Sequence, residues 1–230
     1  QLQSSAASDV YKRQLLSSNK IGKIIGGSAN FTSHGVEGWH PNPEFYYKKG
    51  GGPLFDMGPY YLTALVKALG PIQEVIGYSK KTFEKRNVEN PEVNYKEINV
   101  DVDTHYFGLM KFKSEIIVDF QVTFDVWKPY DPKLEVYGDE SSLKLADPNN
   151  YDGDIFIFDK DLYQWELIYS SPDSQNNFYR GLGVVEMVKA IKNNTVSEDE
   201  LSVPFHILEV MCALDSFDLE SGWTKIIQQF

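Results

Sequence analysis

The sequence contains a single cysteine, Cys212, and comparatively few basic residues. One cysteine cannot form an internal disulfide, which is typical of a protein kept in a reducing compartment. Lys and Arg number 22 against 33 Asp and Glu, and the resulting net charge of −11 excludes nucleic acid and anionic membranes as expected partners. No apolar run reaches the length needed to cross a bilayer. These absences predict a cytoplasmic globular protein.

Aromatic residues are abundant, since 14 Tyr, 14 Phe and 4 Trp make up 14% of the chain. Many of them lie in alternating polar and apolar runs, a pattern that favours β-strands over a helix bundle. Helices are expected where apolar residues recur with helical spacing. The patterns predict strands at 23–33, 72–84, 104–112, 115–127, 133–137, 142–145, 154–158 and 164–169, and helices at 50–69, 177–193 and 203–219.

This order of elements predicts an α+β fold. Short turns such as Lys113-Ser114 and Gly138-Asp139 imply antiparallel neighbours, so we expect an open, mainly antiparallel β-sheet with helices packed on one face. The other face of such a sheet is uncovered, and we expect a homo-oligomer to form through it. The polar, aperiodic stretch at 1–14 is interpreted as a non-native or disordered leader, which leaves one domain over 15–230.

The segment GGGPLFDMGPYY at residues 50–61 is the most informative part of the sequence. Gly50, Gly51 and Gly52 lack Cβ atoms, which allows a flat ligand to approach the backbone closely. A proline then begins a helix, and a spacing of four residues places Asp56 and Tyr60 on one helical face. These groups indicate proton transfer beside a cofactor. The alternative is a flexible loop that caps an ordinary helix, with Asp56 placed there by the helix dipole.

Several longer segments are distinctive: WHPNPEFYYKKGGGPLFDMGPYYLTALVKALGP, THYFGLMKF, FDVW, LEVYGDESSLKLADPN, NFYRGLGVVEMVKAI and FHILEVMCAL. Over 15–230 the chain resembles the Gfo/Idh/MocA oxidoreductases, the family of glucose–fructose oxidoreductase and inositol dehydrogenase. Members of this family carry an N-terminal Rossmann domain that binds NAD or NADP, followed by a C-terminal α+β domain built on an open sheet. The resemblance implies that this chain is the C-terminal, substrate-binding and oligomerisation domain, with the Rossmann domain missing.

The resemblance also implies roles for the motif residues. Asp56 matches the family's motif aspartate, and Tyr60 stands where many members have His and some have Tyr. The chain has no G-x-G-x-x-G and no Glu-Lys-Pro triplet, which in the family supplies a catalytic lysine. The cofactor, NAD or NADP, is therefore expected to be bound mainly by the missing domain, with Gly50, Gly51 and Gly52 close to it.

A free tyrosine has a pKa of about 10 and is a poor base at neutral pH. We therefore expect Tyr60 to share proton transfer with the lysine of the missing domain. Asp56 is expected to orient that lysine or a substrate hydroxyl.

Trp39, His40 and His105 are candidates for substrate contact. Trp39 and His40 lie in a run rich in groups that stack on or hydrogen-bond a polyol, with a rim contact and a structural loop role as the alternatives. His105 opens a strand, where a substrate-facing position and a structural role both fit. His206 lies on an apolar helix and is interpreted as packing. Because the four histidines are scattered without carboxylates or thiolates at metal-ligand spacing, no metal site is predicted.

The function that the resemblance implies is hydride transfer at a secondary alcohol or carbonyl of a sugar, polyol or related compound. The isolated chain is expected neither to bind NAD(P) tightly nor to turn over. The alternative is a non-catalytic oligomerisation or ligand-binding module derived from the same domain. A stand-alone sugar-binding protein is a third possibility, although it needs a closed pocket.

Overall fold

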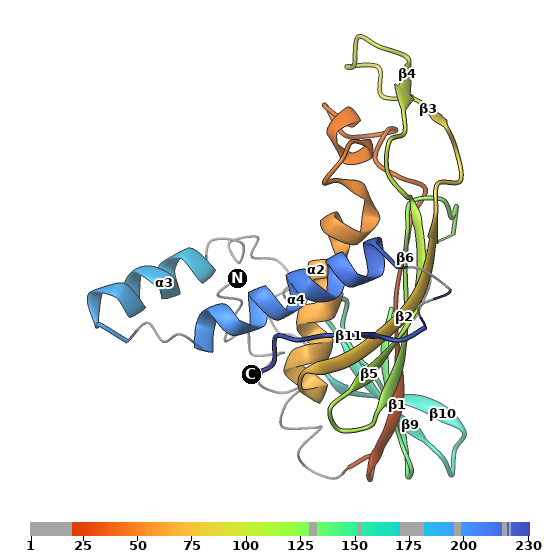
Figure 1. The fold of residues 1–230 in the computed structure, drawn as a ribbon. Helices are drawn as coiled ribbons and strands as arrows, with labels where there is room; N and C mark the ends of the chain where they lie inside the picture. Colours follow the sequence, from red (N-terminus) through yellow and green to blue (C-terminus); the bar gives the residue numbers. More distant parts are fainter. Residues whose placement is uncertain are drawn as a thin grey trace.

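A nine-stranded mixed sheet forms the centre of the molecule (Figure 1). The computed structural model describes residues 20–128, 133–150, 153–170, 182–195, 199–217, 220 and 222–230, so the predicted leader at 1–14 lies outside the described residues. The strands follow the order β10-β9-β8-β7-β1-β6-β5-β2-β11. Among the described strands, β1 and β6 pair in parallel and the other neighbours are antiparallel. The predicted open, mainly antiparallel sheet is confirmed.

The predicted strands all form, although several are shorter at their ends than expected. Three further strands were not predicted, because a segment of two or three residues shows no periodic pattern. The sheet strands are β1 (Ile24–Thr32), β2 (Ile72–Lys80), β5 (His105–Phe112), β6 (Ile117–Thr123), β7 (Leu134–Gly138), β8 (Ser142–Lys144), β9 (Ile155–Asp159), β10 (Gln164–Tyr169) and β11 (Thr224–Lys225). A separate antiparallel ribbon pairs β3 (Lys85–Asn87) with β4 (Glu97–Asn99), and the helices are the 3-10 helix η1 (Glu44–Tyr47), α2 (Gly52–Leu69), α3 (Leu182–Lys192) and α4 (Asp199–Asp215).

The core lies between the sheet and the two helices α2 and α4, which cross the same face of it (Figure 1). We call this the helix face and the opposite one the open face. Alternation along β5 sends successive side chains to the two faces. Tyr106 and Met110 are buried on the helix face, whereas Phe107 and Leu109 on the open face are 49% and 41% exposed. The expected arrangement of helices on one face is confirmed for α2 and α4.

The helix α4 begins at Asp199, earlier than the predicted start at 203. The prediction placed Pro204 in the first turn, where a missing N–H is harmless. In the structure Pro204 lies in the second turn, so it removes one internal hydrogen bond, and the helix continues through it. No described helix is long and apolar enough to cross a membrane.

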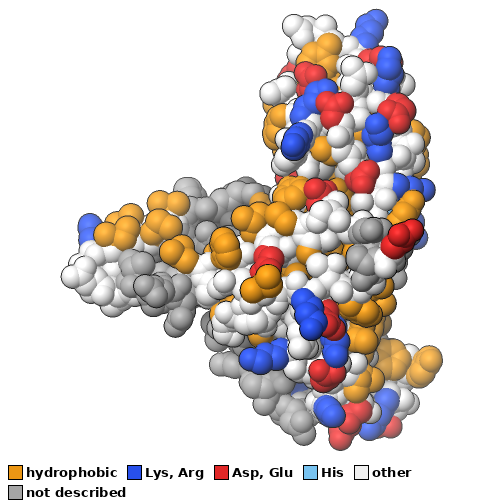
Figure 2. Space-filling view, in the orientation of Figure 1, with side chains coloured by type: hydrophobic (Ala, Val, Ile, Leu, Met, Phe, Trp, Pro, Cys, Tyr) orange, Lys and Arg blue, Asp and Glu red, His pale blue; other side chains and the backbone are white. Residues whose placement is uncertain are grey.

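The helix α3 projects away from the sheet (Figure 1). Its predicted start at 177 falls on residues outside the described part, where 182 is the first helical residue. Figure 2 shows apolar side chains gathered on this helix. The exposed apolar residues of α3 are Val184, Val185, Met187, Val188 and Ile191.

His206 connects α4 to the start of β2 and to the C-terminal tail. The imidazole is fully buried, and its Nε2 accepts a hydrogen bond from the backbone N–H of Ile72 at 3.0 Å. Its Nδ1 lies 2.5 Å from the carbonyl oxygen of Gln228 and donates to it. The interpretation of His206 as packing is therefore incomplete, because the ring also joins three segments through hydrogen bonds.

Because His206 is buried and hydrogen-bonded, we expect the free energy of unfolding of the protein to depend on pH. Burial lowers the pKa of His206 below its ordinary value of 6.5, and only the neutral ring accepts the Ile72 N–H. Its contribution is complete above about pH 6.5 and is lost as the pH falls toward the lowered pKa of the folded state, because the unfolded chain binds the proton first. We expect urea titrations to show a lower free energy of unfolding at about pH 5.5 than at about pH 7.5.

The variant His206→Gln should weaken this pH dependence. It should also destabilise the fold by about 1–3 kcal/mol at neutral pH, because the Ile72 N–H and the Gln228 carbonyl lose their hydrogen bonds to the ring. The matched comparison is the variant His105→Gln, because burial lowers the pKa of His105 as well. If His206→Gln kept the full pH dependence of the unchanged chain, the assignment to His206 would be wrong.

Candidate functional site

Four side chains come together where the loop after β1 meets the first turns of α2. The rings of His40 and Tyr46 are nearly perpendicular, with centroids 5.0 Å apart. Burial raises the pKa of Tyr46, and the neighbouring Asp56 and Tyr60 raise it further. His40 in turn acts on the Asp56 carboxyl through its charge. The structure therefore pairs the rings of His40 and Tyr46, and it places Asp56 and Tyr60 near enough to act on this pair through their charge; we call these four residues the cluster.

Asp56 is a half-buried carboxyl in which the charged form is disfavoured. Burial raises its pKa above the ordinary value of 3.8, and the charge of His40 lowers it by less. No hydrogen bond to its carboxylate occurs within the described residues, which leaves both oxygens available to a ligand. A carboxyl whose pKa is shifted in a cluster of polar groups is typical of a site of proton transfer.

Pro59 lies between Asp56 and Tyr60 in the interior of α2. It has no N–H, so the carbonyl of Phe55 receives no bond from the residue four positions later. The hydroxyl of Thr63 donates to the Pro59 carbonyl at 2.6 Å. The regular bonding of α2 thus lacks one hydrogen bond beside Asp56.

The loop that carries His40 is fixed by hydrogen bonds to the segment after β3. The side-chain amide of Asn90 donates to the carbonyls of Trp39 at 3.1 Å and His40 at 3.0 Å. The Nδ1 atom of His40 accepts the backbone N–H of Asn42 at 3.0 Å. A neutral His40 therefore carries its proton on Nε2, which is the nitrogen free to face a ligand.

The fold itself requires glycine at two positions of the motif, for reasons that the sequence did not indicate. A Cβ on Gly51 would lie 2.7 Å from the carbonyl oxygens of Phe45 and Tyr46, so the backbone of the chain itself occupies that space. Gly52 has a φ of +83°, which favours glycine, and a Cβ there would lie 3.1 Å from the carbonyl of Asp103. Of the three glycines, Gly50 alone has open space beside it.

Tyr46 was missed because its signal is weak. It belongs to the aromatic run EFYY, in which the sequence does not show which ring faces the motif. The 3-10 helix η1 decides this, since Tyr47 is buried while Tyr46 lies against His40. A prediction of η1 and its orientation would have been needed to find Tyr46.

Trp39 and His105 are not part of this cluster. Trp39 is 65% exposed and lines a separate cavity, although its ring centroid lies 5.4 Å from that of His40. His105 lies on the open face beside Phe107, and its Nδ1 is 3.0 Å from the Thr123 hydroxyl. A substrate contact from His105 stays a prediction, and its position on the other side of the sheet from α2 does not favour one.

The described residues hold no group of His, Cys, Asp and Glu arranged to bind a metal ion. For a nucleotide cofactor the chain offers the space beside Gly50 and the free oxygens of Asp56. The glycines do precede the start of α2, but the backbone of Phe45 and Tyr46 fills the space beside Gly51, where an open phosphate-binding turn would leave room for a pyrophosphate.

Comparisons with known proteins identify the fold and its family. A model of the GFO/IDH/MocA C-terminal domain matches residues 11–144. No curated protein sequence matches the chain.

Among solved structures, an oxidoreductase domain protein from Kribbella flavida is 20% identical with a TM-score of 0.69, over 96% of this chain and 64% of that chain. Levoglucosan dehydrogenase in complex with NADH and levoglucosan is 13% identical with a TM-score of 0.75, over 97% and 64%. An NAD binding oxidoreductase from Klebsiella pneumoniae is 18% identical with a TM-score of 0.68, over 96% and 64%. These TM-scores show that the chain shares its fold with the three structures. The chain spans about 64% of the length of these structures.

The raised pKa of Asp56 predicts that its carboxylate disfavours the folded state at neutral pH. The unfolded chain ionises at lower pH than the folded one, so the cost appears as the pH rises above about 4. We expect Asp56→Asn to raise the urea midpoint at pH 7 and to change it little near pH 4. The matched control is Asp139→Asn, since Asp139 accepts the Lys23 N–H at 2.8 Å, and this variant should lower the midpoint. A destabilising Asp56→Asn would contradict the prediction.

Proposed function

The chain belongs to the GFO/IDH/MocA C-terminal domain family, and from this membership we propose that it forms the substrate side of an NAD(P)-dependent oxidoreductase acting on a sugar, polyol or related compound. The reaction is hydride transfer at a secondary alcohol or carbonyl. The observation that carries the proposal is the Asp56 carboxyl, half-buried, without a hydrogen bond in the described chain, and beside His40 and Tyr46. Carboxyl, imidazole and phenol groups are the side chains that most often transfer protons in enzymes.

The substrate class is supported by one of the structural matches. Levoglucosan dehydrogenase forms a complex with NADH and levoglucosan, and another with NADH and L-sorbose. The cluster contains carboxyl, phenol and imidazole groups, and each can form a hydrogen bond with a hydroxyl. A hydroxylated substrate therefore suits the cluster, and a purely apolar one does not.

Each residue of the cluster has a distinct part in the proposed reaction. The carboxylate of Asp56 accepts a hydrogen bond from the reacting hydroxyl and orients it. The Tyr60 phenol, one turn later on α2, passes the proton to a base outside this chain, and the Nε2–H of His40 donates a hydrogen bond to a substrate hydroxyl. The bound nicotinamide supplies the chemistry of accepting the hydride. Residues outside this chain would hold most of the nucleotide.

The test uses the protein with the coding sequence that lies immediately upstream. We expect NAD(P)-dependent oxidation of a sugar or polyol from a panel, and a Tyr60→Phe variant with turnover lowered about 100-fold or more and a smaller change in KM. Tyr163→Phe is the matched control, since Tyr163 is 83% exposed on the β9–β10 hairpin. It should keep full activity.

The isolated chain should show no tight binding of NADH by nicotinamide fluorescence. Absence of an upstream dinucleotide-binding sequence would favour the non-catalytic module. Unchanged turnover in Tyr60→Phe would remove Tyr60 from the mechanism.

The open face supports a further proposal, that the chain forms a homo-oligomer through it. Tyr78, Phe107, Leu109 and Ile117 project from adjacent strands there and are 52%, 49%, 41% and 45% exposed. A contiguous apolar surface on a sheet face is typical of an interface.

We expect analytical ultracentrifugation to find a dimer or tetramer, and Phe107→Glu to shift it toward monomer because a charge would be buried. Tyr163→Glu, on the exposed hairpin, should leave the mass unchanged. A monomeric unchanged chain would contradict the proposal.

A further inference from the structure

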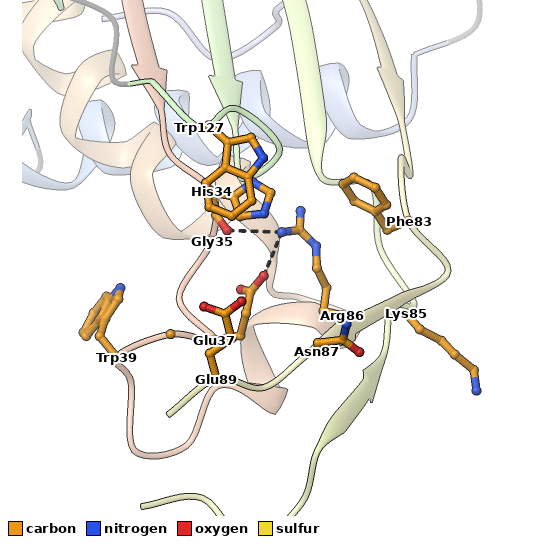
Figure 3. A pocket seen from close by; sticks show the side chains of 11 residues that line it. His34, Gly35, Glu37, Trp39, Phe83, Lys85, Arg86, Asn87, Glu89 and Trp127 are labelled. Carbon is orange, nitrogen blue, oxygen red and sulfur yellow. Dashed lines mark hydrogen bonds and ion pairs between the residues drawn. The ribbon is translucent and has the colours of Figure 1, made fainter. Parts of the chain in front are cut away.

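A cavity of about 350 Å³ lies at the end of the sheet beside the β3–β4 ribbon (Figure 3). Its walls come from the loop after β1, from the segment around β3 and from Trp127 after β6. Asp56, Tyr60 and His40 are not among its lining residues. Its volume falls in the range of small-molecule sites, of about 300–1,000 Å³. The cavity is therefore separate from the proposed reaction site.

The floor of the cavity is a buried ion network around Arg86. The guanidinium is 4% exposed, and its Nη1 donates to the Glu37 carboxylate at 2.8 Å and to the His34 carbonyl at 3.2 Å. Its Nη2 donates to the Phe124 carbonyl at 2.8 Å and to the Asp125 carboxylate. A network of this kind holds the floor rigid, since removing either partner leaves a buried charge.

Buried polar atoms without a partner gather at this end of the sheet. In the described part of the chain three side-chain atoms have none: His34 Nδ1, Arg86 Nε and His105 Nε2. The first two belong to residues that line the cavity, and the His105 ring lies 3.9 Å from the Asp125 carboxylate that pairs with Arg86. Each unpaired buried group costs free energy, so their grouping points to a missing polar partner.

Two exposed rings cover the first two of these atoms. The Trp127 indole stacks on the His34 ring with centroids 3.3 Å apart, although it is itself 76% exposed (Figure 3). The Phe83 ring lies over the Arg86 guanidinium at 4.9 Å and is 42% exposed. Rings with so much free surface can turn aside at low cost, because few contacts hold them. A ligand that displaces one of them reaches the face of the imidazole or guanidinium beneath, beside the edge that carries the unpaired nitrogen.

The charges of the wall select the chemistry of the ligand. Arg86 and Lys85 oppose a cation, while Glu37 and Glu89 oppose an anion. A neutral group that both donates and accepts hydrogen bonds meets no repulsion, and a hydroxyl is such a group. The indole of Trp39, 65% exposed, adds a flat apolar surface at the rim.

We propose that this cavity binds a cyclic sugar or polyol at a second site, beyond the proposed reaction site. One face of the ring packs on the Trp127 or Trp39 indole. Its hydroxyls accept from Arg86 Nε–H and donate to the Glu89 carboxylate, which is exposed at the rim.

The test observes the four tryptophans of the chain separately, by fluorine NMR of protein labelled with 5-fluorotryptophan. The additives are myo-inositol and D-glucose as neutral rings, choline as a cation and inorganic phosphate as an anion. We expect saturable shifts of the Trp39 and Trp127 signals with a neutral ring. The Trp165 and Trp223 signals should stay unchanged. Shifts with choline or phosphate alone, or no saturable shift with either neutral ring, would overturn the proposal.

Matched variants separate this site from the reaction site. Glu89→Gln should weaken binding about tenfold, since it removes a charged acceptor, whereas Glu92→Gln, also exposed but outside the cavity, should leave the affinity unchanged. Asp56→Asn should also leave it unchanged. If Asp56→Asn abolished binding, the ring would occupy the reaction site and the second site would be refuted. If binding persists while the upstream-extended protein lacks oxidoreductase activity, the proposed function fails and the second site stands.

Discussion

The packing of α2 against the helix face of the sheet is the constraint on which the candidate site depends. Leu54 and Leu62 are fully buried, and Gly58 faces α4, since a Cβ there would lie in ordinary contact with the sulfur of Met211 at 3.5 Å. Each buried leucine contributes about 2 kcal/mol. These contacts fix the rotation of the helix about its axis, and that rotation directs Asp56 toward His40 and Tyr46 rather than into the core or into solvent.

Asp56 differs from other carboxylates that are largely removed from solvent in this protein. Asp147 accepts hydrogen bonds from the Tyr61 hydroxyl at 2.9 Å and from the Lys133 ammonium at 2.6 Å. Asp125 and Glu37 both pair with Arg86. A half-buried carboxylate that has no hydrogen-bond partner among the described residues disfavours the folded state, so Asp56 does not serve the fold as Asp147, Asp125 and Glu37 do. Reactive sites often lower the stability of the fold in this way. A group such as Asp56 then finds its hydrogen-bond partner only when the substrate binds.

Much of the sheet could be predicted from the sequence, because alternation over six or more residues, as in β5 and β6, leaves one register that buries the apolar side chains. The ribbon of β3 and β4 could not, since three residues carry no period. The role of Arg86 was missed because its two carboxylate partners are 49 and 39 positions away in the chain, and a sequence does not show which distant residues meet. The glycines were recognised as significant, yet Gly51 serves a close approach of backbone to backbone, a contact that spacing cannot reveal.

Two neighbouring residues of the loop between β1 and α2 belong to different sites, although their rings are only 5.4 Å apart. Trp39 lines the cavity at the end of the sheet, while the next residue, His40, turns toward Asp56. Asn90 holds the carbonyls of both, so neither residue can move far without the other. Because the loop is held by these few bonds and not by a ladder, its side chains can change without disturbing the core. The buried helix and sheet thus fix where the chemistry takes place, and the loop determines which groups take part in it.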